Sequence, residues 1–95
     1  MYKYKPFLYI FVKKCNQKRR ANGICDLCGR PAPFKDKKNR PYLESHHIVW
    51  LSRGGADNIE NTVAVDPSCH RKLHILDLET DVNNLFRKVN NYSKI

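Results

Sequence analysis

Two short stretches decide how this chain folds: residues 44–48, Glu-Ser-His-His-Ile, and residues 66–74, Asp-Pro-Ser-Cys-His-Arg-Lys-Leu-His. The second stretch begins as helices do, and helical spacing places His70 and His74 on one face, a turn apart. The first stretch is typical of a strand end, where the adjacent His46 and His47 point to opposite faces. Two imidazoles on a helix can bind one divalent metal ion. A metal ligand and a general base must point in separate directions, and His46 and His47 do so. These two histidines can therefore provide a further metal ligand and a general base.

A second candidate metal site precedes these stretches. Cys25-Asp-Leu-Cys28 is a C-x2-C turn, a spacing that lets two thiolates converge on Zn²⁺. Asp66-Pro-Ser-Cys69 has the same spacing with a carboxylate in the first position, and a carboxylate oxygen is a normal zinc ligand. We expect a structural site formed by Cys25, Cys28, Asp66 and Cys69. For the fourth ligand, Cys15 and a water molecule remain alternatives to Asp66.

Length and composition support a small metal-stabilised domain. The chain has 95 residues, enough for one domain whose core alone provides little stability. A hydrophobic content of 41% argues against complete disorder, and no apolar run approaches the length of a membrane span. No signal peptide is evident, so we expect a cytoplasmic protein without a membrane partner. In a reducing compartment, cysteines are metal ligands more often than disulfides.

The net charge of +9 indicates a polyanionic partner, with nucleic acid first. Residues 1–20 carry seven Lys and Arg and no acidic residue, and aromatic residues alternate with these bases. This arm either is solvated or packs one face on the domain and offers the other to phosphates; spacing does not separate the two interpretations. The arm's candidate DNA-binding residues are Lys13, Lys14, Lys18, Arg19 and Arg20.

The expected elements follow from periodicity and from turn residues. A basic helix over 12–21 should end at Asn22-Gly23, and residues 30–40 should form a polar loop. Strands are expected over 42–48 and 62–65, joined by a loop over 52–61 in which Gly54 and Gly55 allow positive φ. Helices should cover 68–76 and about 80–91. Thr80 is the expected N-cap of the last helix, whose apolar face is Val82, Leu85, Phe86 and Val89.

The order of these motifs resembles that of the HNH nuclease family, in particular the HNH domain of McrA-like 5-methylcytosine-specific restriction endonucleases. The segments that carry the resemblance are Cys25-x2-Cys28, Tyr42-Leu-Glu-Ser-His-His-Ile48, Gly54-Gly-Ala-Asp-Asn58, Asn61-Thr-Val and Cys69-His-Arg-Lys-Leu-His74. They span about residues 21–76. The family usually has Cys-Pro-x-Cys before the helix, whereas Asp66 stands here in place of the first cysteine.

The resemblance implies an α+β domain, a small ββα-metal (His-Me finger) fold with a structural zinc knuckle and flanking helices. Residues 1–20 would be a basic arm or helix and residues 21–95 the HNH domain, with its ββα core over about 42–76. His47 would be the general base. Asn61 would hold the loop and orient that base through its backbone carbonyl, and Glu44 would support the site. The metal ligands would be His46, His70 and His74.

The resemblance also implies a function, a metal-dependent endonuclease that hydrolyses phosphodiester bonds of double-stranded DNA. Nicking and double-strand cleavage both remain open. The expected cofactors are a structural Zn²⁺ and a catalytic Mg²⁺, Mn²⁺, Ni²⁺ or Zn²⁺. Arg53, Arg71 and Lys72 are further candidates for DNA contact, although they are equally consistent with solvated charges. The sequence leaves the oligomeric state open, a homodimer included. The alternative function is an inactive zinc-stabilised DNA-binding module, which gives no reason for the four histidines.

Overall fold

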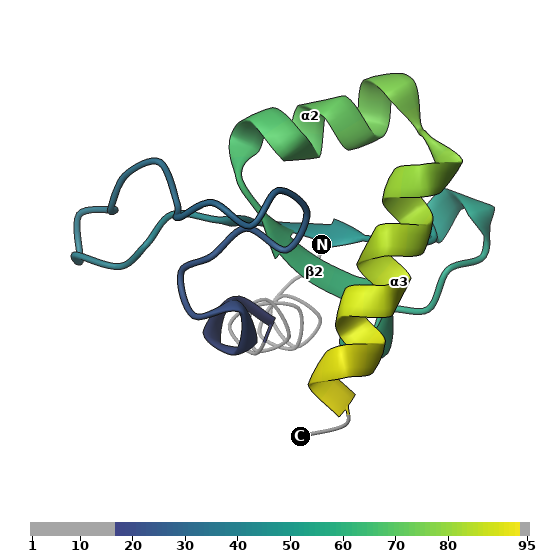
Figure 1. Ribbon diagram of the computed structural model, residues 1–95, viewed down its shortest axis with the longest axis horizontal. Helices are drawn as coiled ribbons and strands as arrows, with labels where there is room; N and C mark the ends of the chain where they lie inside the picture. Colours follow the sequence, from purple (N-terminus) through teal and green to yellow (C-terminus); the bar gives the residue numbers. More distant parts are fainter. Residues whose placement is uncertain (1–16, 94–95) are drawn as a thin grey trace, which may run out of the picture.

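A two-stranded antiparallel hairpin followed by two helices forms the centre of the protein (Figure 1). The computed structural model describes residues 17–93. Its elements are β1 (Glu44–His47), η1 (Leu51–Arg53), η2 (Ile59–Asn61), β2 (Thr62–Val65), α2 (Pro67–Leu76) and α3 (Glu79–Ser93). Residues 17–21 are helical as well, and that helix ends at Asn22 and Gly23, which both have positive φ. The expected α+β class with a ββα unit is confirmed.

The hairpin register determines which strand side chains face helix α2. Glu44 is opposite Val65, His46 is opposite Val63, and β2 is buried along its whole length. Strand β1 is shorter than expected, because the chain bends immediately after it, at residues 48–49. Helix α2 packs against β1, so the histidines of the strand and of the helix come from adjoining elements.

Helix α2 begins and ends at residues with suitable side chains and backbone geometry. The carboxylate of Asp66 accepts a hydrogen bond from the Cys69 backbone N–H at 2.7 Å, and Pro67 follows as the first helical residue. Asp77 ends the helix with a φ of 49°. The helix thus starts one residue before the expected position.

Helix α3 starts at Glu79, so the prediction of Thr80 as its N-cap is wrong: Thr80 lies inside the first turn. Glu79 and Asp81 in that turn place negative charge at the positive end of the helix. Of the expected apolar face, Leu85 and Val89 are buried, while Phe86 is 36% exposed. The core is completed by Ala21, Cys25, Leu43, Ile48, Val63, Ala64, Val65 and Leu73.

Polar contacts from Asp26 tie the C-x2-C turn to β2 and α3. One carboxylate oxygen accepts from the Ala64 N–H at 2.9 Å, and the other accepts from the Tyr92 hydroxyl at 2.6 Å. Burial and this hydrogen bond to Asp26 raise the pKa of Tyr92, so its hydroxyl keeps the proton that it donates. Asp26 therefore fixes the turn independently of any metal.

Arg20 has a structural position rather than the expected DNA-facing one. Its guanidinium donates to the backbone carbonyls of Ile59 at 3.0 Å and Thr62 at 2.6 Å, and it lies over the Tyr92 ring at 4.6 Å. These contacts direct the charge into the protein. We therefore remove Arg20 from the proposed DNA contacts. Within residues 17–93, no helix is both long and apolar enough to cross a membrane.

Candidate active site

Three histidines converge between β1 and α2. His46 comes from the strand and is 4% exposed, while His70 and His74 come from successive turns of the helix. The Nε2 atoms of His70 and His74 are 3.2 Å apart, and one ring nitrogen of each histidine lies within 4.8 Å of the others. Nitrogen ligands of one ion, at about 2.1 Å from it, lie about 3.0–3.4 Å apart. The donor set of three imidazole nitrogens fits a divalent metal ion.

His46 is uncharged at neutral pH. Burial, followed by the charges of His70, His74 and His47, lowers its pKa from 6.5 to about 4. A metal ligand must offer the lone pair of a neutral imidazole. The position of His46 therefore prepares it to bind a cation without first losing a proton.

This pKa predicts a dependence of stability on pH. The unfolded chain binds a proton at His46 below about pH 6.5, whereas the folded protein resists it down to about pH 4. The contribution of His46 to stability is therefore complete above pH 6.5 and decreases as the pH falls toward 4. Between those values, at constant zinc, we expect the unfolding free energy of the parent to fall by about 3 kcal/mol more than that of His46→Gln. Urea unfolding curves measure this difference, and parallel pH dependences would contradict it.

Glu44 contacts His70 and does not line the pocket. Its Oε1 lies 2.8 Å from Nδ1 of His70, and its Oε2 accepts a hydrogen bond from the Tyr42 hydroxyl at 2.9 Å. The hydrogen bond with His70 is the main reason that the pKa of Glu44 is lowered. A carboxylate on one ring nitrogen fixes the orientation of a metal-binding imidazole and presents the other nitrogen. Sequence reasoning missed this role of Tyr42, which lies two residues before Glu44 and just outside β1.

His47 is separated from the three-histidine cluster and has its own acidic partner. Its Nε2 lies 2.9 Å from Oδ1 of Asp57, a residue of the loop between η1 and η2. The resemblance implied that the Asn61 carbonyl orients this imidazole. In the structure that carbonyl accepts from the Ile48 N–H at 2.8 Å, and Asp57 contacts His47 instead.

Asn61 holds the loop closed with its side-chain amide. The Oδ1 atom accepts from the Val49 N–H at 2.9 Å, while Nδ2 donates to the carbonyls of Val49 at 3.0 Å and Ala56 at 2.8 Å. A side chain on Gly55 would place its Cβ 1.8 Å from the Val49 oxygen. Gly54 has the expected positive φ, but Gly55 does not; it is required for close approach.

An open pocket of about 340 Å³ gives access to these groups. Its lining residues are Ser45, His46, His47, Trp50, Leu51, Ser52, His70 and His74. The Trp50 ring centroid is 4.9 Å from that of His74, and the guanidinium of Arg53 lies 4.0 Å from the Trp50 centroid. The three-histidine cluster and His47 thus face one space large enough for a phosphodiester group.

Among the described residues, two of the other predicted DNA contacts pair with acidic side chains. Arg53 also pairs with Asp77 at 2.9 Å, and the Lys72 amine lies 3.5 Å from Asp81. Arg71 and Arg19 are exposed, and Lys18 is half-buried. Lys13 and Lys14, like Cys15, lie outside the described residues.

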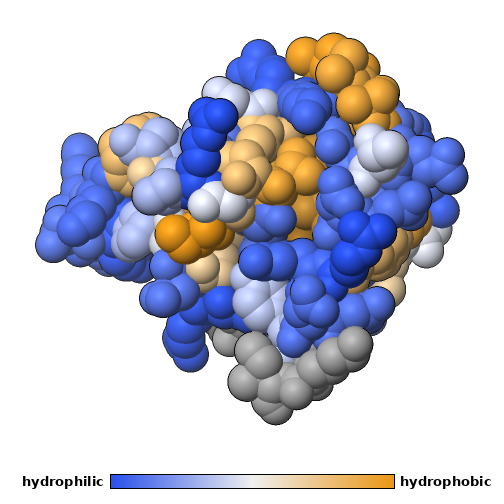
Figure 2. Space-filling model, in the orientation of Figure 1, coloured by the Kyte–Doolittle hydropathy of each residue, from blue (hydrophilic) through white to orange (hydrophobic). Residues whose placement is uncertain are grey.

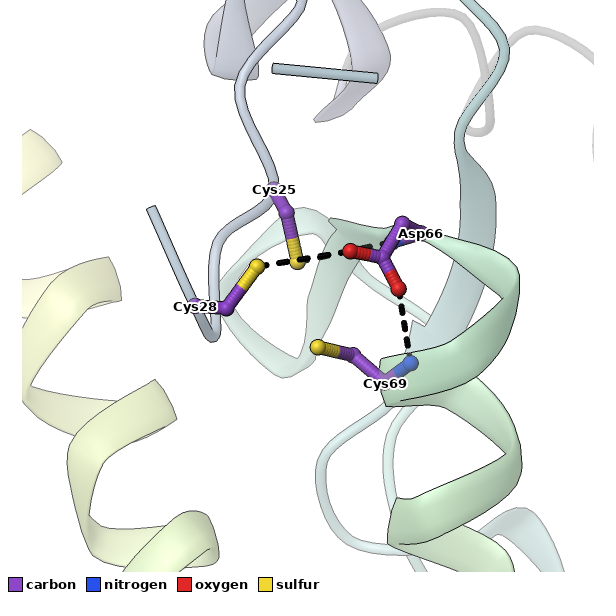
Figure 3. A group of neighbouring side chains, drawn as sticks. All are labelled: Cys25, Cys28, Asp66 and Cys69. Carbon is purple, nitrogen blue, oxygen red and sulfur yellow. Dashed lines mark hydrogen bonds between the residues drawn. The ribbon is translucent and has the colours of Figure 1, made fainter. Parts of the chain in front are cut away.

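The second candidate metal site brings together the four expected side chains (Figure 3). Ligand atoms of Cys25, Cys28, Asp66 and Cys69 lie within 4.8 Å of one another, and the Cys28 sulfur is 3.3 Å from Oδ2 of Asp66. Sulfur and oxygen ligands of a tetrahedral zinc ion lie about 3.5 Å apart. Oδ1 of Asp66 caps α2, which leaves Oδ2 directed at the cysteines.

The thiols of this cluster resist ionisation, whereas its carboxylate ionises readily. Burial first, then the nearby Cys25, raises the pKa of Cys69, and burial likewise raises that of Cys28. Partial burial opposes the ionisation of Asp66, but hydrogen bonds from the Cys69 backbone and from Cys28 outweigh it, so its pKa is lowered. Thiols that resist ionisation need the charge of a bound cation to become thiolates. The donor set of three sulfurs and one carboxylate fits zinc.

The model of the HNH endonuclease family matches residues 25–75, more than half of the chain. The chain belongs to the HNH endonuclease family. A segment of 56 residues is 52% identical to the type IV methyl-directed restriction enzyme EcoKMcrA of Escherichia coli, covering 59% of this chain and 20% of that protein. A segment of 38 residues is 40% identical to anaredoxin of a Nostoc species, covering 40% of this chain and 50% of that protein.

A solved structure shares the fold of this HNH protein. The type IV phosphorothioation-dependent restriction endonuclease ScoMcrA matches with a TM-score of 0.67 and 22% identity, over 86% of this chain and 16% of that one. At that identity the likeness concerns the fold alone. The chain spans about a fifth of the length of EcoKMcrA and about half of the length of anaredoxin.

Proposed function

We propose that this chain is a metal-dependent endonuclease that hydrolyses phosphodiester bonds of double-stranded DNA. One observation carries the proposal: a single pocket contains a three-histidine cluster and, beside it, a fourth histidine that contacts a carboxylate. An inactive DNA-binding module gives no reason for this arrangement. Membership of the HNH endonuclease family supports the same conclusion.

His47 is the proposed general base. Imidazole can take up and release a proton near neutral pH, as activation of a water molecule requires. The proton of that water would move to His47 as the oxygen attacks the phosphorus. The bond from phosphorus to the 3′ oxygen would break, and the leaving 3′ oxygen would take a proton from a solvent water molecule. Asp57 would orient the ring and stabilise the imidazolium that forms. The products would carry 5′-phosphate and 3′-hydroxyl ends.

His46, His70 and His74 are the proposed metal ligands, with His70 oriented by Glu44. A divalent ion bound there supplies positive charge beside the phosphate and the leaving oxygen. We further propose that Asn61 keeps the loop that carries Asp57 in place. Residues 21–95 would be the nuclease domain and residues 1–20 a basic arm, and structural zinc would occupy the cysteine cluster.

The test is cleavage of supercoiled plasmid by zinc-loaded protein. We expect nicked or linear DNA when Mg²⁺, Mn²⁺, Ni²⁺ or further Zn²⁺ is added, and none in EDTA. Intact plasmid with every metal, from protein that is folded and binds DNA, would favour the inactive module.

Loss of a ligand should weaken binding of the catalytic metal ion in a measurable way. His74 is exposed at the pocket edge, so His74→Ala should leave the fold intact. We expect the metal concentration for half-maximal cleavage to rise by at least roughly 10–100-fold, with part of the activity restored at high metal. Ile75→Ala is the matched control, because Ile75 follows on the same helix and is 69% exposed. Equal metal titrations for both variants would remove His74 from the ligand set.

A further inference from the structure

One loop carries the whole excess of positive charge in the described part of the chain. Residues 17–93 contain thirteen Lys and Arg against nine Asp and Glu. Residues 30–40 hold five of those bases and one of the acids, which leaves eight of each elsewhere. The loop therefore dominates the electrostatic field that the described residues present to an approaching polyanion.

This loop projects from the domain as a finger, defined here as residues 33–41 (Figure 1). An antiparallel bridge joins Lys35 to Pro41, and the Tyr42 N–H donates to the Phe34 carbonyl at 2.9 Å. Every finger residue except Asp36 is exposed, and Figure 2 shows the projection covered mainly by hydrophilic side chains. The finger is too exposed to contribute to the core, so packing against the core does not account for its conformation.

The tip of the finger is held in one conformation by Asp36. Its carboxylate accepts hydrogen bonds from the backbone N–H of Arg40 at 3.0 Å, the backbone N–H of Lys38 at 2.9 Å and the Arg40 guanidinium at 3.1 Å. The Arg40 backbone bond, with the others, lowers the pKa of Asp36. Among the described residues, Lys35, Lys37 and Lys38 take part in no ion pair. The turn thus uses its acid internally and leaves three lysines for a partner.

The base of the finger is connected to the candidate active site. The rings of Phe34 and Tyr42 stack with centroids 4.9 Å apart and planes 13° apart. The Tyr42 hydroxyl donates to Glu44, whose other oxygen contacts His70. A partner bound to the finger is therefore held in a fixed relation to the three-histidine cluster.

We propose that the finger binds phosphates of duplex DNA beside the bond that is cleaved. The inference rests on the proposed function and adds a binding surface to it. Lysine ammonium groups bind phosphates as point charges, without reading bases. Contacts of this kind set the position of the duplex, and the link through Tyr42 aligns that position with the pocket.

The experiment compares Lys37→Gln/Lys38→Gln with Arg87→Gln/Lys88→Gln in the full chain. Both remove two positive charges from exposed or half-buried positions, one pair at the finger tip and one on α3. Binding to a fluorescent duplex is measured over a series of NaCl concentrations without added divalent metal, so that cleavage does not interfere. For the finger variant we expect roughly tenfold weaker binding at low salt, and a log–log salt slope shallower by up to roughly 1.8. The α3 variant should keep the parental slope.

Equal losses of duplex affinity in both variants would show that binding depends only on the net charge of the protein, and would overturn the inference. An unchanged salt slope for duplex binding by the finger variant would also overturn it. Plasmid cleavage by the parent tests the proposed function separately. If the parent cleaves plasmid but the finger variant binds the duplex normally, only the proposed role of the finger is contradicted. If the parent binds the duplex through the finger but never cleaves plasmid, only the proposed nuclease activity is contradicted.

Discussion

His47→Ala is expected to lower the rate of plasmid cleavage by about 10²–10⁴-fold, the usual effect of removing a general base. His47 lies at the end of β1, outside the three-histidine cluster and outside the core. Its removal should therefore leave zinc content, melting temperature and duplex binding unchanged. The measurement is the single-turnover nicking rate at saturating metal. Nicking at the parental rate would exclude His47 as the base.

Asp57→Asn provides the matched test of how His47 is held. The amide keeps the size of the side chain, but it loses the charge that favours the imidazolium. We expect a loss of roughly 10–100-fold, as for other partners that orient an active-site histidine. Duplex binding and the melting temperature should stay at the parental values. A purely structural defect would instead lower the melting temperature.

The parts of the site that sequence predicts are those set by local spacing. The placement of His70 and His74 follows from the helical repeat, and the helix start follows from Asp66 and Pro67. The cysteine turn depends on only four consecutive residues, and strand β2 occupies the expected residues 62–65. In each case the decisive interactions are between neighbours in sequence, so the pattern is visible without the fold.

The missed contacts join segments that are distant in sequence. Asp57 meets His47 only because the Asn61 amide folds the loop back, and Asp26 meets Tyr92 across 66 positions of chain. The basic neighbours of Arg20 predict a DNA contact, yet hydrogen bonds with distant backbone carbonyls decide its position. Neither the periodicity nor the charge of the sequence indicates these contacts, because each depends on the path that the chain takes between the two residues.

Loss of the cysteine cluster should have the largest effect on stability. A structural zinc site contributes on the order of 10 kcal/mol, comparable to the whole stability of a domain of this size. Cys28 is exposed, so Cys28→Ala removes little packing and tests the metal almost alone. We expect this variant to lose bound zinc and to be largely unfolded at room temperature, as judged by circular dichroism and metal analysis. A melting temperature equal to that of the parent would exclude a structural zinc.

Asp66 caps α2, and substitutions can separate this role from its proposed role as a zinc ligand. Asparagine retains an oxygen that caps α2, so Asp66→Asn should change only the ligand, whereas Asp66→Ala removes both the ligand and the hydrogen bond from Cys69. If the carboxylate binds zinc, both variants should lose zinc affinity, and Asp66→Cys should hold zinc at least as tightly as the parent, because thiolate is the softer donor. If Asp66 serves only as a cap, Asp66→Asn should match the parent, Asp66→Ala should cost about 1 kcal/mol, and Cys15→Ser should release the metal instead. Zinc content and melting temperature across these four variants distinguish the two ligand sets. If Asp66 binds zinc, Asp66→Asn should lower both quantities more than Cys15→Ser does; if Cys15 binds zinc, the order should be reversed.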